Sequence, residues 1–444
     1  MTAPLNSRVQ RTLVAFYGDD FTGSSENLAQ LCQTGLKGRL FFETADPALI
    51  IAEARTLDVV GIAGTARALS PETMAPTLSR AFATLQAIEP GIIQYKVCST
   101  FDSSRRTGNF AVAIRQALTR WPGAIVPVSA ATPGFGRYTA FSNHFANHNG
   151  SVLRLDRNPA LRDHPSTPMK EADLRRHLID LGCARVEAIH WPELGRDVTR
   201  LLLNRGANSV PVVIDGMSDD DMIQVAAAIW RAKDTHPVFA LAAQGLAGAL
   251  GQVIARERGI HGEPAVTRPP TPADRMLVLS GSCSVQTGRQ LEAAQAAGWA
   301  MIEIPLGRTG TPSQADTLAD ELSKRVVAEL RGGRSVAAFS ARGNVTASFD
   351  AARTRALGDV MAGICRTAVI EAGLRRVIFA GGDTSSYAMT SIGADALDLV
   401  AFDALRNCHV FRIRARDELD RVEVLLKGGQ VGSDNFFLEA LGTQ

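Results

Sequence analysis

Short apolar runs alternate with longer amphipathic segments along almost the whole chain. The apolar runs end in glycine or other small residues, as buried strands often do, and in the first half they lie at residues 12–18, 57–64, 123–130 and 210–216. Between them, residues 71–88 and 218–233 carry apolar side chains at helical spacing and begin with proline and serine. This alternation predicts an α/β fold built from βα units around mainly parallel sheets.

One segment interrupts the alternation. Residues 258–275 contain four prolines and two glycines and show no periodicity, which is typical of a linker, and a new strand pattern begins at residue 276. A chain of 444 residues also exceeds the size that one hydrophobic core usually serves. We therefore expect two α/β domains, residues 1–262 and 276–444, with a linker at 263–275 and an interdomain cleft that holds the site.

The overall composition argues against several classes of partner. The 47 basic and 45 acidic residues leave a net charge of +2, and only four Trp and four Tyr are present, so neither a nucleic acid nor a membrane surface is expected as a partner. Residues 238–255 carry no charge, but they are rich in Ala and Gly and are interpreted as a buried core helix. The absence of an apolar leader and of CxxC pairs predicts a cytoplasmic protein.

Common catalytic and nucleotide-binding motifs are missing. The sequence has no Walker A motif, no GxGxxG and no GxSxG, which weakens a P-loop, a dinucleotide-binding and a serine-hydrolase interpretation. His144 and His148 share the i, i+4 spacing of a helix, but the glutamate of an HExxH motif is absent. We therefore interpret this histidine pair as structural.

Polar residues follow predicted strands in the N-terminal half. Four stretches show this feature, namely residues 17–23 (YGDDFTG), 95–109, 128–138 and 163–169. Adjacent carboxylates such as Asp19 and Asp20 repel each other unless cations lie near them, and Lys96 is one of only six lysines. Taken singly, each stretch has a structural explanation as a solvated turn, a cap or a loop anchor. Taken together, they predict a pocket for a small polyol acid, with Lys96 and Arg137 as carboxylate ligands.

Three glycine-rich loops characterise the C-terminal half. They lie in residues 279–290, 379–386 and 426–437, and the first two run from a predicted strand into a predicted helix. Such loops expose backbone N–H groups that bind phosphate oxygens, and glycine allows the close approach. A nucleoside triphosphate is the ligand that best accounts for three such loops in one domain.

The chain resembles the four-carbon acid sugar kinase family, the ATP-dependent kinases of tetronates and 3-oxo-tetronates. The matching motifs are GDDFTG, YKVCSTFDS with GN, HPSTPM, SGSCS, FAGGDTS and KGGQVGSDNFF, and they follow the family's order. The resemblance implies that the N-terminal domain binds the acid sugar and that the C-terminal domain binds ATP with Mg²⁺. It places the following residues at the sugar acid: Asp19, Asp20, Lys96, Asp102, Ser103 and Arg137. It places these residues at the nucleotide: Ser280, Ser282, Gly381, Gly382, Thr384, Gly428, Gly429 and Gly432.

The implied reaction is transfer of the γ-phosphoryl group of ATP to a terminal hydroxyl of a small sugar acid. A 3-oxo-tetronate, a tetronate and 3-oxo-isoapionate are all candidate acceptors, the last because the YGDDFTGS form is similar to that of members acting on branched or oxidised acids. Two carboxylates remain candidates for the catalytic base. Asp20 lies among basic residues, and Asp383 lies in a Gly-Gly-Asp turn at the start of a predicted helix.

Two other functions stay open at this point. One is a two-domain dehydrogenase or lyase acting on a similar hydroxy acid, although the missing GxGxxG and metal-ligand spacing count against it. The other is a binding protein that closes on a sugar acid without chemistry. The sequence identifies no metal ligands and leaves the oligomeric state open, with a homodimer as one option.

Overall fold

The computed structural model describes residues 12–148, 150–163, 167–260, 272–342, 351–403, 405 and 408–442, without the side chains of residues 351 and 383. The chain divides into two compact units, residues 1–39 with 46–262 and residues 40–45 with 263–444. Most of the linker expected at 263–275 lies outside the described residues, since the description resumes at residue 272.

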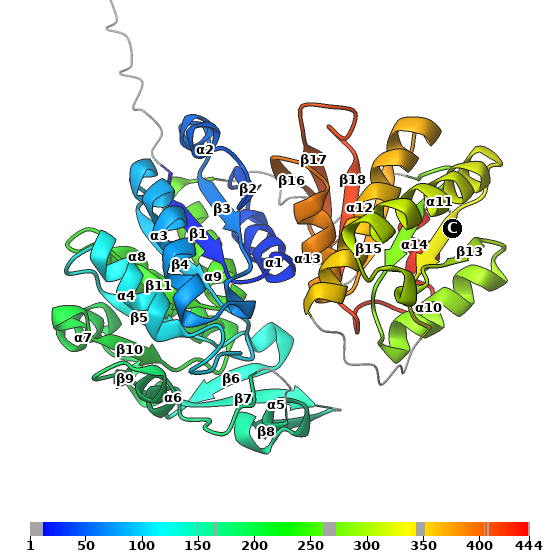
Figure 1. The fold of residues 1–444 in the computed structure, drawn as a ribbon. Helices are drawn as coiled ribbons and strands as arrows, with labels where there is room; N and C mark the ends of the chain where they lie inside the picture. Colours follow the sequence, from blue (N-terminus) through cyan, green and yellow to red (C-terminus); the bar gives the residue numbers. More distant parts are fainter. Residues whose placement is uncertain are drawn as a thin grey trace, which may run out of the picture. The chain divides into compact units, whose positions relative to one another are not determined.

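The N-terminal unit contains a parallel sheet of seven described strands (Figure 1). Its strands are β1 (Val14–Gly18), β3 (Val59–Ala63), β4 (Ile92–Lys96), β5 (Val126–Ser129), β9 (Glu187–Ile189), β10 (Pro211–Ile214) and β11 (Phe239–Ala242). Their order is β3-β1-β4-β11-β5-β10-β9, and all their pairings are parallel. Every residue of β1 and β4 is buried, because helices cover both faces of a parallel sheet.

Two groups of helices cover this sheet. One group is α1 (Phe21–Cys32), α7 (Val198–Arg205), α8 (Asp219–Ala232) and α9 (Gln244–Arg258), which pack in the order α1, α9, α8, α7. The other group is α2 (Pro47–Ala54), α3 (Pro71–Ile88), α4 (Phe110–Arg120) and α6 (Leu174–Leu181), which pack one against the next. A small antiparallel sheet is inserted after β5, with β6 (Arg137–Ala140), β7 (Asn143–His148) and β8 (Ser151–Arg154), followed by the short α5 (Pro159–Arg162).

The C-terminal unit has a second, mixed sheet (Figure 1). Its strands are β12 (Leu277–Ser280), β13 (Ala300–Glu303), β14 (Val336–Phe339), β15 (Arg376–Ala380), β16 (Ala396–Ala401), β17 (Val410–Arg414) and β18 (Glu423–Lys427). The order is β13-β14-β12-β15-β18-β17-β16, and β17 runs antiparallel to both of its neighbours. Helices α10 (Val285–Ala296) and α14 (Phe436–Leu441) pack together, and α12 (Ala351–Ala372) packs between α11 (Pro312–Arg331) and α13 (Gly382–Ser391). The remaining strand, β2 (Gly38–Phe42), has residues 38–39 in the N-terminal unit and residues 40–42 in the C-terminal unit.

The structure confirms the predicted α/β class and most of the predicted elements. Helix α3 occupies residues 71–88 as predicted, and each predicted strand run contains a strand. Residues 238–255 were expected to form one helix, and this is wrong: the segment begins with β11, and α9 starts only at Gln244. No helix among the described residues is long and apolar enough to cross a membrane.

The histidine pair of the N-terminal half lies on a strand, not on a helix. His144 and His148 both belong to β7, so their helical spacing has no structural meaning. His144 is fully buried, with Thr139 Oγ1 2.8 Å from its Nδ1 and the Ser99 carbonyl oxygen 2.8 Å from its Nε2. Burial lowers the pKa of His144 to about 4, so the ring is neutral at pH 7 and ties β7 to the loop after β4. The structural interpretation of His144 therefore agrees with its contacts.

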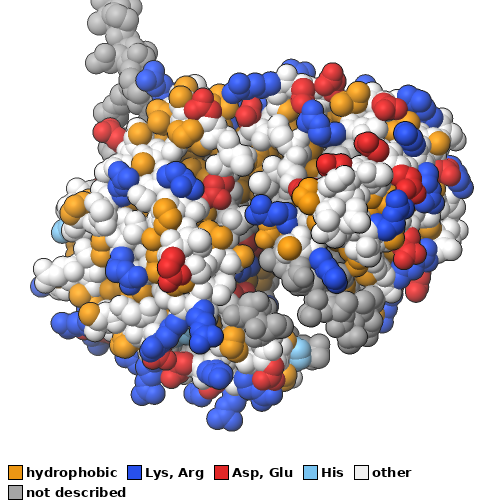
Figure 2. All heavy atoms as spheres, viewed as in Figure 1, with side chains coloured by type: hydrophobic (Ala, Val, Ile, Leu, Met, Phe, Trp, Pro, Cys, Tyr) orange, Lys and Arg blue, Asp and Glu red, His pale blue; other side chains and the backbone are white. Residues whose placement is uncertain are grey.

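The viewed face of the molecule carries basic and acidic side chains side by side. Figure 2 shows the blue and red side chains interspersed, with no extended region of one sign. This distribution matches the small net charge of +2.

Candidate functional site

The N-terminal candidate site lies at the carboxyl ends of three neighbouring strands. Gly18 of β1 is in register with Ala63 of β3 and with Lys96 of β4. The residues that follow these strands therefore meet at one edge of the sheet, where α/β proteins commonly bind ligands. The structure brings together Asp19, Asp20 and Lys96 at this edge, and adds Arg67, which sequence reasoning missed.

These four charged residues form one ion-pair cluster. Arg67 donates from Nε and Nη2 to the two carboxylate oxygens of Asp19, at 3.2 and 2.8 Å. The same Nη2 lies 2.9 Å from Asp20 Oδ1, and Lys96 Nζ donates to that oxygen at 3.1 Å. Two positive and two negative groups therefore balance. This pairing explains how adjacent carboxylates are tolerated at the end of a buried strand.

The two carboxylates differ in exposure. The Asp19 side chain is 1% exposed and both of its oxygens are bonded to Arg67, whereas the Asp20 side chain is 23% exposed and only its Oδ1 accepts from the cluster. Burial raises the pKa of Asp19 against the opposing effect of Arg67 and Lys96. Burial also acts to raise the pKa of Asp20, but Arg67 and Lys96 outweigh it and hold that pKa below its usual range. Asp20 is thus the partly accessible member of the pair, and its pKa is the lower of the two.

Gly23, in the first turn of α1, makes room for this cluster. A Cβ built on Gly23 would overlap Lys96 Nζ and Asp20 Oδ1. The last glycine of the GDDFTG motif is therefore required by the close approach of the lysine ammonium to the helix, and not by an unusual backbone angle.

The loop after β4 places its predicted residues in two different environments. Asp102 and Cys98 are both half-buried, and the charge of Asp102 acts on the Cys98 thiol, together with the charges of Arg67, Lys96 and Asp20. Asp102 therefore lies in the surroundings of the cluster. Burial is the main cause that raises the pKa of Cys98.

Ser103 is held by a neighbouring helix. Its hydroxyl is buried, donates to the Phe101 carbonyl oxygen at 3.1 Å, and lies 2.7 Å from His177 Nε2 of α6. Burial lowers the pKa of His177 to about 4, so the ring is neutral at pH 7. The structure thus shows Ser103 anchoring the loop, and its predicted contact with substrate stays a prediction.

Arg137 lies apart from the ion-pair cluster. It begins β6 in the small antiparallel sheet, and its Nη1 donates to the carbonyl oxygens of Phe135 and Gly136 at 3.0 and 3.3 Å. Its Nε is buried without a partner among the described residues. Its role as a carboxylate ligand stays a prediction. His164 of the HPSTPM motif lies outside the described residues, and Thr167 is buried.

The three glycine-rich loops of the C-terminal unit follow three neighbouring strands, β12, β15 and β18. A Cβ on Gly281 would overlap Thr384, and a Cβ on Gly381 would lie 3.1 Å from the Ser282 backbone nitrogen. Gly429 packs in the same way against Ser282 and Ser284. The loops are therefore in direct contact, and glycine is what lets their backbones approach.

A hydroxyl network joins the first loop to the third at the start of α10. Ser284 caps α10 by accepting from the Thr287 backbone N–H at 3.1 Å, and its hydroxyl also donates to the Gly429 carbonyl oxygen. Thr287 Oγ1 donates to Ser282 Oγ at 3.0 Å and lies 3.1 Å from the Gly429 carbonyl oxygen. This network fixes the shape of the third loop against the start of α10.

The other predicted nucleotide residues occupy the same loops. Gly381 has φ +124° and precedes α13, which begins at Gly382, while Gly432 has φ +88°. Thr384 is buried, and the hydroxyls of Ser280 and Ser385 are buried without a hydrogen-bond partner among the described residues. The side chain of Asp383, the second candidate base, lies outside the description, so its role stays a prediction.

Lys427 is the second charged residue that sequence reasoning missed. It ends β18, is 1% exposed, and donates from Nζ to Thr287 Oγ1 at 3.0 Å. One signal could have indicated both missed residues, because each lies at or just after the carboxyl end of a strand. Arg67 follows β3, and Lys427 ends β18 and begins the KGGQVGSDNFF motif. Lys427 was also one of only six lysines in the chain.

A metal centre built by protein ligands is not found in the described residues. No group of three or more His, Cys, Asp or Glu side chains gathers there. The charges of Asp19 and Asp20 are already balanced by Arg67 and Lys96. These two carboxylates therefore do not fit a site that holds Mg²⁺ by protein ligands alone.

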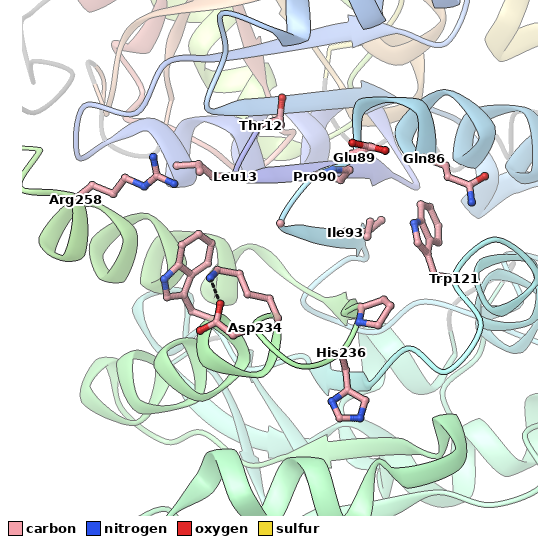
Figure 3. Close-up of a pocket in the computed structure, with 14 residues that line it drawn as sticks. Thr12, Leu13, Gln86, Glu89, Pro90, Ile93, Trp121, Asp234, His236 and Arg258 are labelled. Atoms are coloured by element: carbon pink, nitrogen blue, oxygen red, sulfur yellow. Dashed lines mark hydrogen bonds and ion pairs between the residues drawn. The ribbon is translucent and has the colours of Figure 1, made fainter. Parts of the chain in front are cut away.

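A cavity of about 590 Å³ lies at the other end of the N-terminal sheet. Leu13 and Gly91, which line it, precede β1 and β4, and Pro237 comes two residues before β11. Figure 3 shows Ile93, near the amino end of β4, and Trp121, which directly follows α4, around this cavity. Asp20 and Lys96 lie at the opposite, carboxyl ends of β1 and β4. The cavity is thus separate from the ion-pair cluster.

Comparison with known proteins assigns a domain type to each half of the chain. Residues 14–250 match a family described as a sugar-binding N-terminal domain, and residues 277–437 match a nucleotide-binding C-terminal domain. The chain is 32% identical to a 3-oxo-isoapionate kinase from Paraburkholderia graminis, covering 96% of this chain and 93% of that protein. It is 27% identical to a 3-oxo-tetronate kinase from Methylobacterium radiotolerans, covering 95% of this chain and 97% of that protein.

Solved structures show the same fold. A protein from Salmonella typhimurium LT2 superposes with a TM-score of 0.74 at 21% identity, covering 97% of this chain and 99% of that one. A protein from Haemophilus influenzae superposes with a TM-score of 0.72 at 18% identity, again covering 97% of this chain and 99% of that one. The two domain matches and the full-length similarity to named kinases establish that the chain is a kinase of the four-carbon acid sugar kinase family.

Proposed function

We propose that this kinase transfers the γ-phosphoryl group of ATP to a terminal hydroxyl of a small sugar acid, with 3-oxo-isoapionate as the first candidate and a 3-oxo-tetronate or tetronate as the next. The relative named 3-oxo-isoapionate kinase is more similar to this chain, at 32% identity, than the 3-oxo-tetronate kinase reported above, at 27%. Mg²⁺ would arrive bound to the nucleotide phosphates, as it does in many kinases.

The observation that carries the proposal is the asymmetric carboxylate pair. Arg67 and Lys96 hold Asp20 Oδ1, which leaves Oδ2 of a partly exposed, ionised carboxylate to accept a hydrogen bond from the acceptor hydroxyl. Such a bond orients the hydroxyl oxygen toward the phosphorus and provides a site for its proton as the P–O bond forms. Because its pKa is held low, Asp20 is ionised at neutral pH and can accept this hydrogen bond.

The anionic substrate needs a cation that the ion-pair cluster does not already use. Arg67 uses Nε and Nη2 for the carboxylates, and its side chain remains 25% exposed. The cluster is electrically balanced without substrate, so binding of the acid needs a further positive group. Arg137, whose Nε has no partner among the described residues, is the proposed ligand for the substrate carboxylate.

An ADP-release screen with Mg·ATP tests the substrate. The purified protein is assayed against 3-oxo-isoapionate, 3-oxo-tetronates and tetronates, and the highest kcat/KM is expected for the first. ADP release that does not depend on any of these acids would contradict the proposal.

Asparagine variants test the base. Asp20→Asn keeps the shape of the side chain but removes the proton acceptor, and we expect kcat to fall at least about a hundredfold with little change in the KM for ATP. Asp383→Asn, assayed in parallel, decides between the two candidates. If neither variant loses that much, the assignment of an aspartate base is wrong.

A further inference from the structure

Lys427 is a buried lysine with no acidic partner among the described residues. Its side chain is 1% exposed, which is as buried as Lys96 at 2%, but Lys96 has Asp20 as its counter-ion. No carboxylate lies within salt-bridge distance of Lys427 in the part of the chain that the structure describes. Burying an ammonium group without a counter-charge is unfavourable, so the position calls for an explanation.

The hydrogen bonds of Lys427 do not supply that explanation. Besides Thr287 Oγ1, Nζ donates to the carbonyl oxygens of Gly428 and Gly429 at 3.1 and 3.3 Å. Each of these acceptors has a second donor: the Val431 N–H reaches the Gly428 oxygen at 3.2 Å, and the hydroxyls of Ser284 and Thr287 reach the Gly429 oxygen. No acceptor would be left unsatisfied without the lysine, so the loop does not need its charge for hydrogen bonding.

The position of Lys427 indicates what the charge is for. It directly precedes the first two glycines of the third glycine-rich loop, and its own carbonyl oxygen accepts from the Gly381 N–H of the second loop at 2.9 Å. Its Nζ is bonded to the first turn of α10, whose N-terminus favours an anion. The hydroxyls of Ser280, at the end of β12, and Ser385, in the first turn of α13, are buried without a hydrogen-bond partner among the described residues. Every one of these features suits a group of phosphate oxygens.

We infer that Lys427 supplies the buried positive charge that binds the phosphates of a nucleoside di- or triphosphate to the three glycine-rich loops, with the ligand as its missing counter-charge. The loop backbone separates the Lys427 ammonium group from the bound phosphates. Lys427 therefore attracts the phosphates electrostatically across the third loop. This inference rests on the proposed function, because it takes the nucleotide to be the ligand of these loops.

The test compares Lys427→Met with the wild type in the full-length protein by isothermal titration calorimetry. Methionine has a similar length without the charge, and we expect it to weaken binding of Mg·ATP and of inorganic tripolyphosphate at least tenfold. The melting temperature without ligand should stay at or above that of the wild type, because no acceptor is orphaned and a buried charge is removed. Lys324→Met, on the exposed surface of α11, is the matched control and should bind ATP as the wild type does.

The outcomes separate the inference from the proposed function. If the wild type does not bind ATP at all, the proposed function fails and the inference falls with it. If the wild type binds ATP and Lys427→Met binds it equally well, the inference alone is overturned. A lowered melting temperature without ligand, combined with unchanged ATP affinity of the folded variant, would assign Lys427 a purely structural role and would also overturn it.

A measurement on the wild type alone keeps the inference testable if the variant does not fold. Burial lowers the pKa of Lys427 to about 8, and the Cys408 thiol is the titratable group whose charge acts on it among the described residues. An anion bound to the loops raises that pKa, so nucleotide binding at pH 8.5 should take up protons. Titrations in two buffers of different ionisation enthalpy measure this uptake. Binding without proton uptake would overturn the inference.

Discussion

Replacing Arg67 by methionine would leave the carboxylate of Asp19 buried without a bonded cation. Asp19 is 1% exposed and both of its oxygens are bonded to Arg67. Removing one partner of a buried ion pair costs about 3–5 kcal/mol of unfolding free energy. Because the Arg67 side chain is 25% exposed, the lower end applies, and we expect a loss of about 3 kcal/mol.

A second substitution tests whether the stranded charge is the cause. Asp19→Asn in the Arg67→Met background removes that charge, and we expect the double variant to recover about 2 kcal/mol of the loss. The loss in Arg67→Met should also depend on pH. Burial already raises the pKa of Asp19, and loss of Arg67 raises it further, so the folded state binds a proton more readily than the unfolded state. The deficit should therefore shrink as the pH falls from 7.5 to 5.

Urea unfolding followed by tryptophan fluorescence measures these free energies. Trp121, Trp191 and Trp230 lie in the N-terminal unit, so most of the signal reports on the unit that contains Arg67. Arg80→Met, at an exposed position of α3, is the control and should change the unfolding free energy by less than about 0.5 kcal/mol. A loss below about 1 kcal/mol in Arg67→Met, or a double variant less stable than the single one, would refute the reasoning.

Three further outcomes follow from the same contacts. Gly23→Ala should abolish most kinase activity while the protein stays folded, since the added Cβ overlaps Lys96 Nζ; activity close to that of the wild type would show that the cluster tolerates displacement. The folded-state pKa of about 4 for His177 means that the unfolded state binds more protons between pH 4 and 6.5, so the unfolding free energy falls as the pH falls through that window. His177→Gln removes this titrating group and should flatten the decline, as measured by urea midpoints at pH 5 and pH 7. Gly429→Ala should raise the Kd for ATP severalfold in calorimetry, because the loop must move away from Ser282, and an unchanged Kd would place the nucleotide elsewhere.

The sequence by itself determined the class of fold and the edges of the sheets at which the candidate site residues lie. Strands such as β1 are buried along their whole length, so a continuous apolar run identifies them locally. Helix α3 could be bounded because Ser70 and Pro71 begin it and its apolar spacing continues to Ile88. The motif residues that follow strands could be grouped because the carboxyl ends of parallel strands share one edge of a sheet.

The tertiary structure alone decided which charges pair. Arg67 lies 48 residues from Asp19, and Lys427 lies 140 residues from Thr287, so no local pattern connects either pair. Strand order brings the members of each pair together, and burial then determines how strongly each charge affects stability and binding. Burial also distinguishes Asp19 from Asp20, which look equivalent in the sequence, because adjacent residues after a strand face different surroundings. Hydrophobic pattern is a property of neighbours in the chain, whereas charge compensation is a property of neighbours in space.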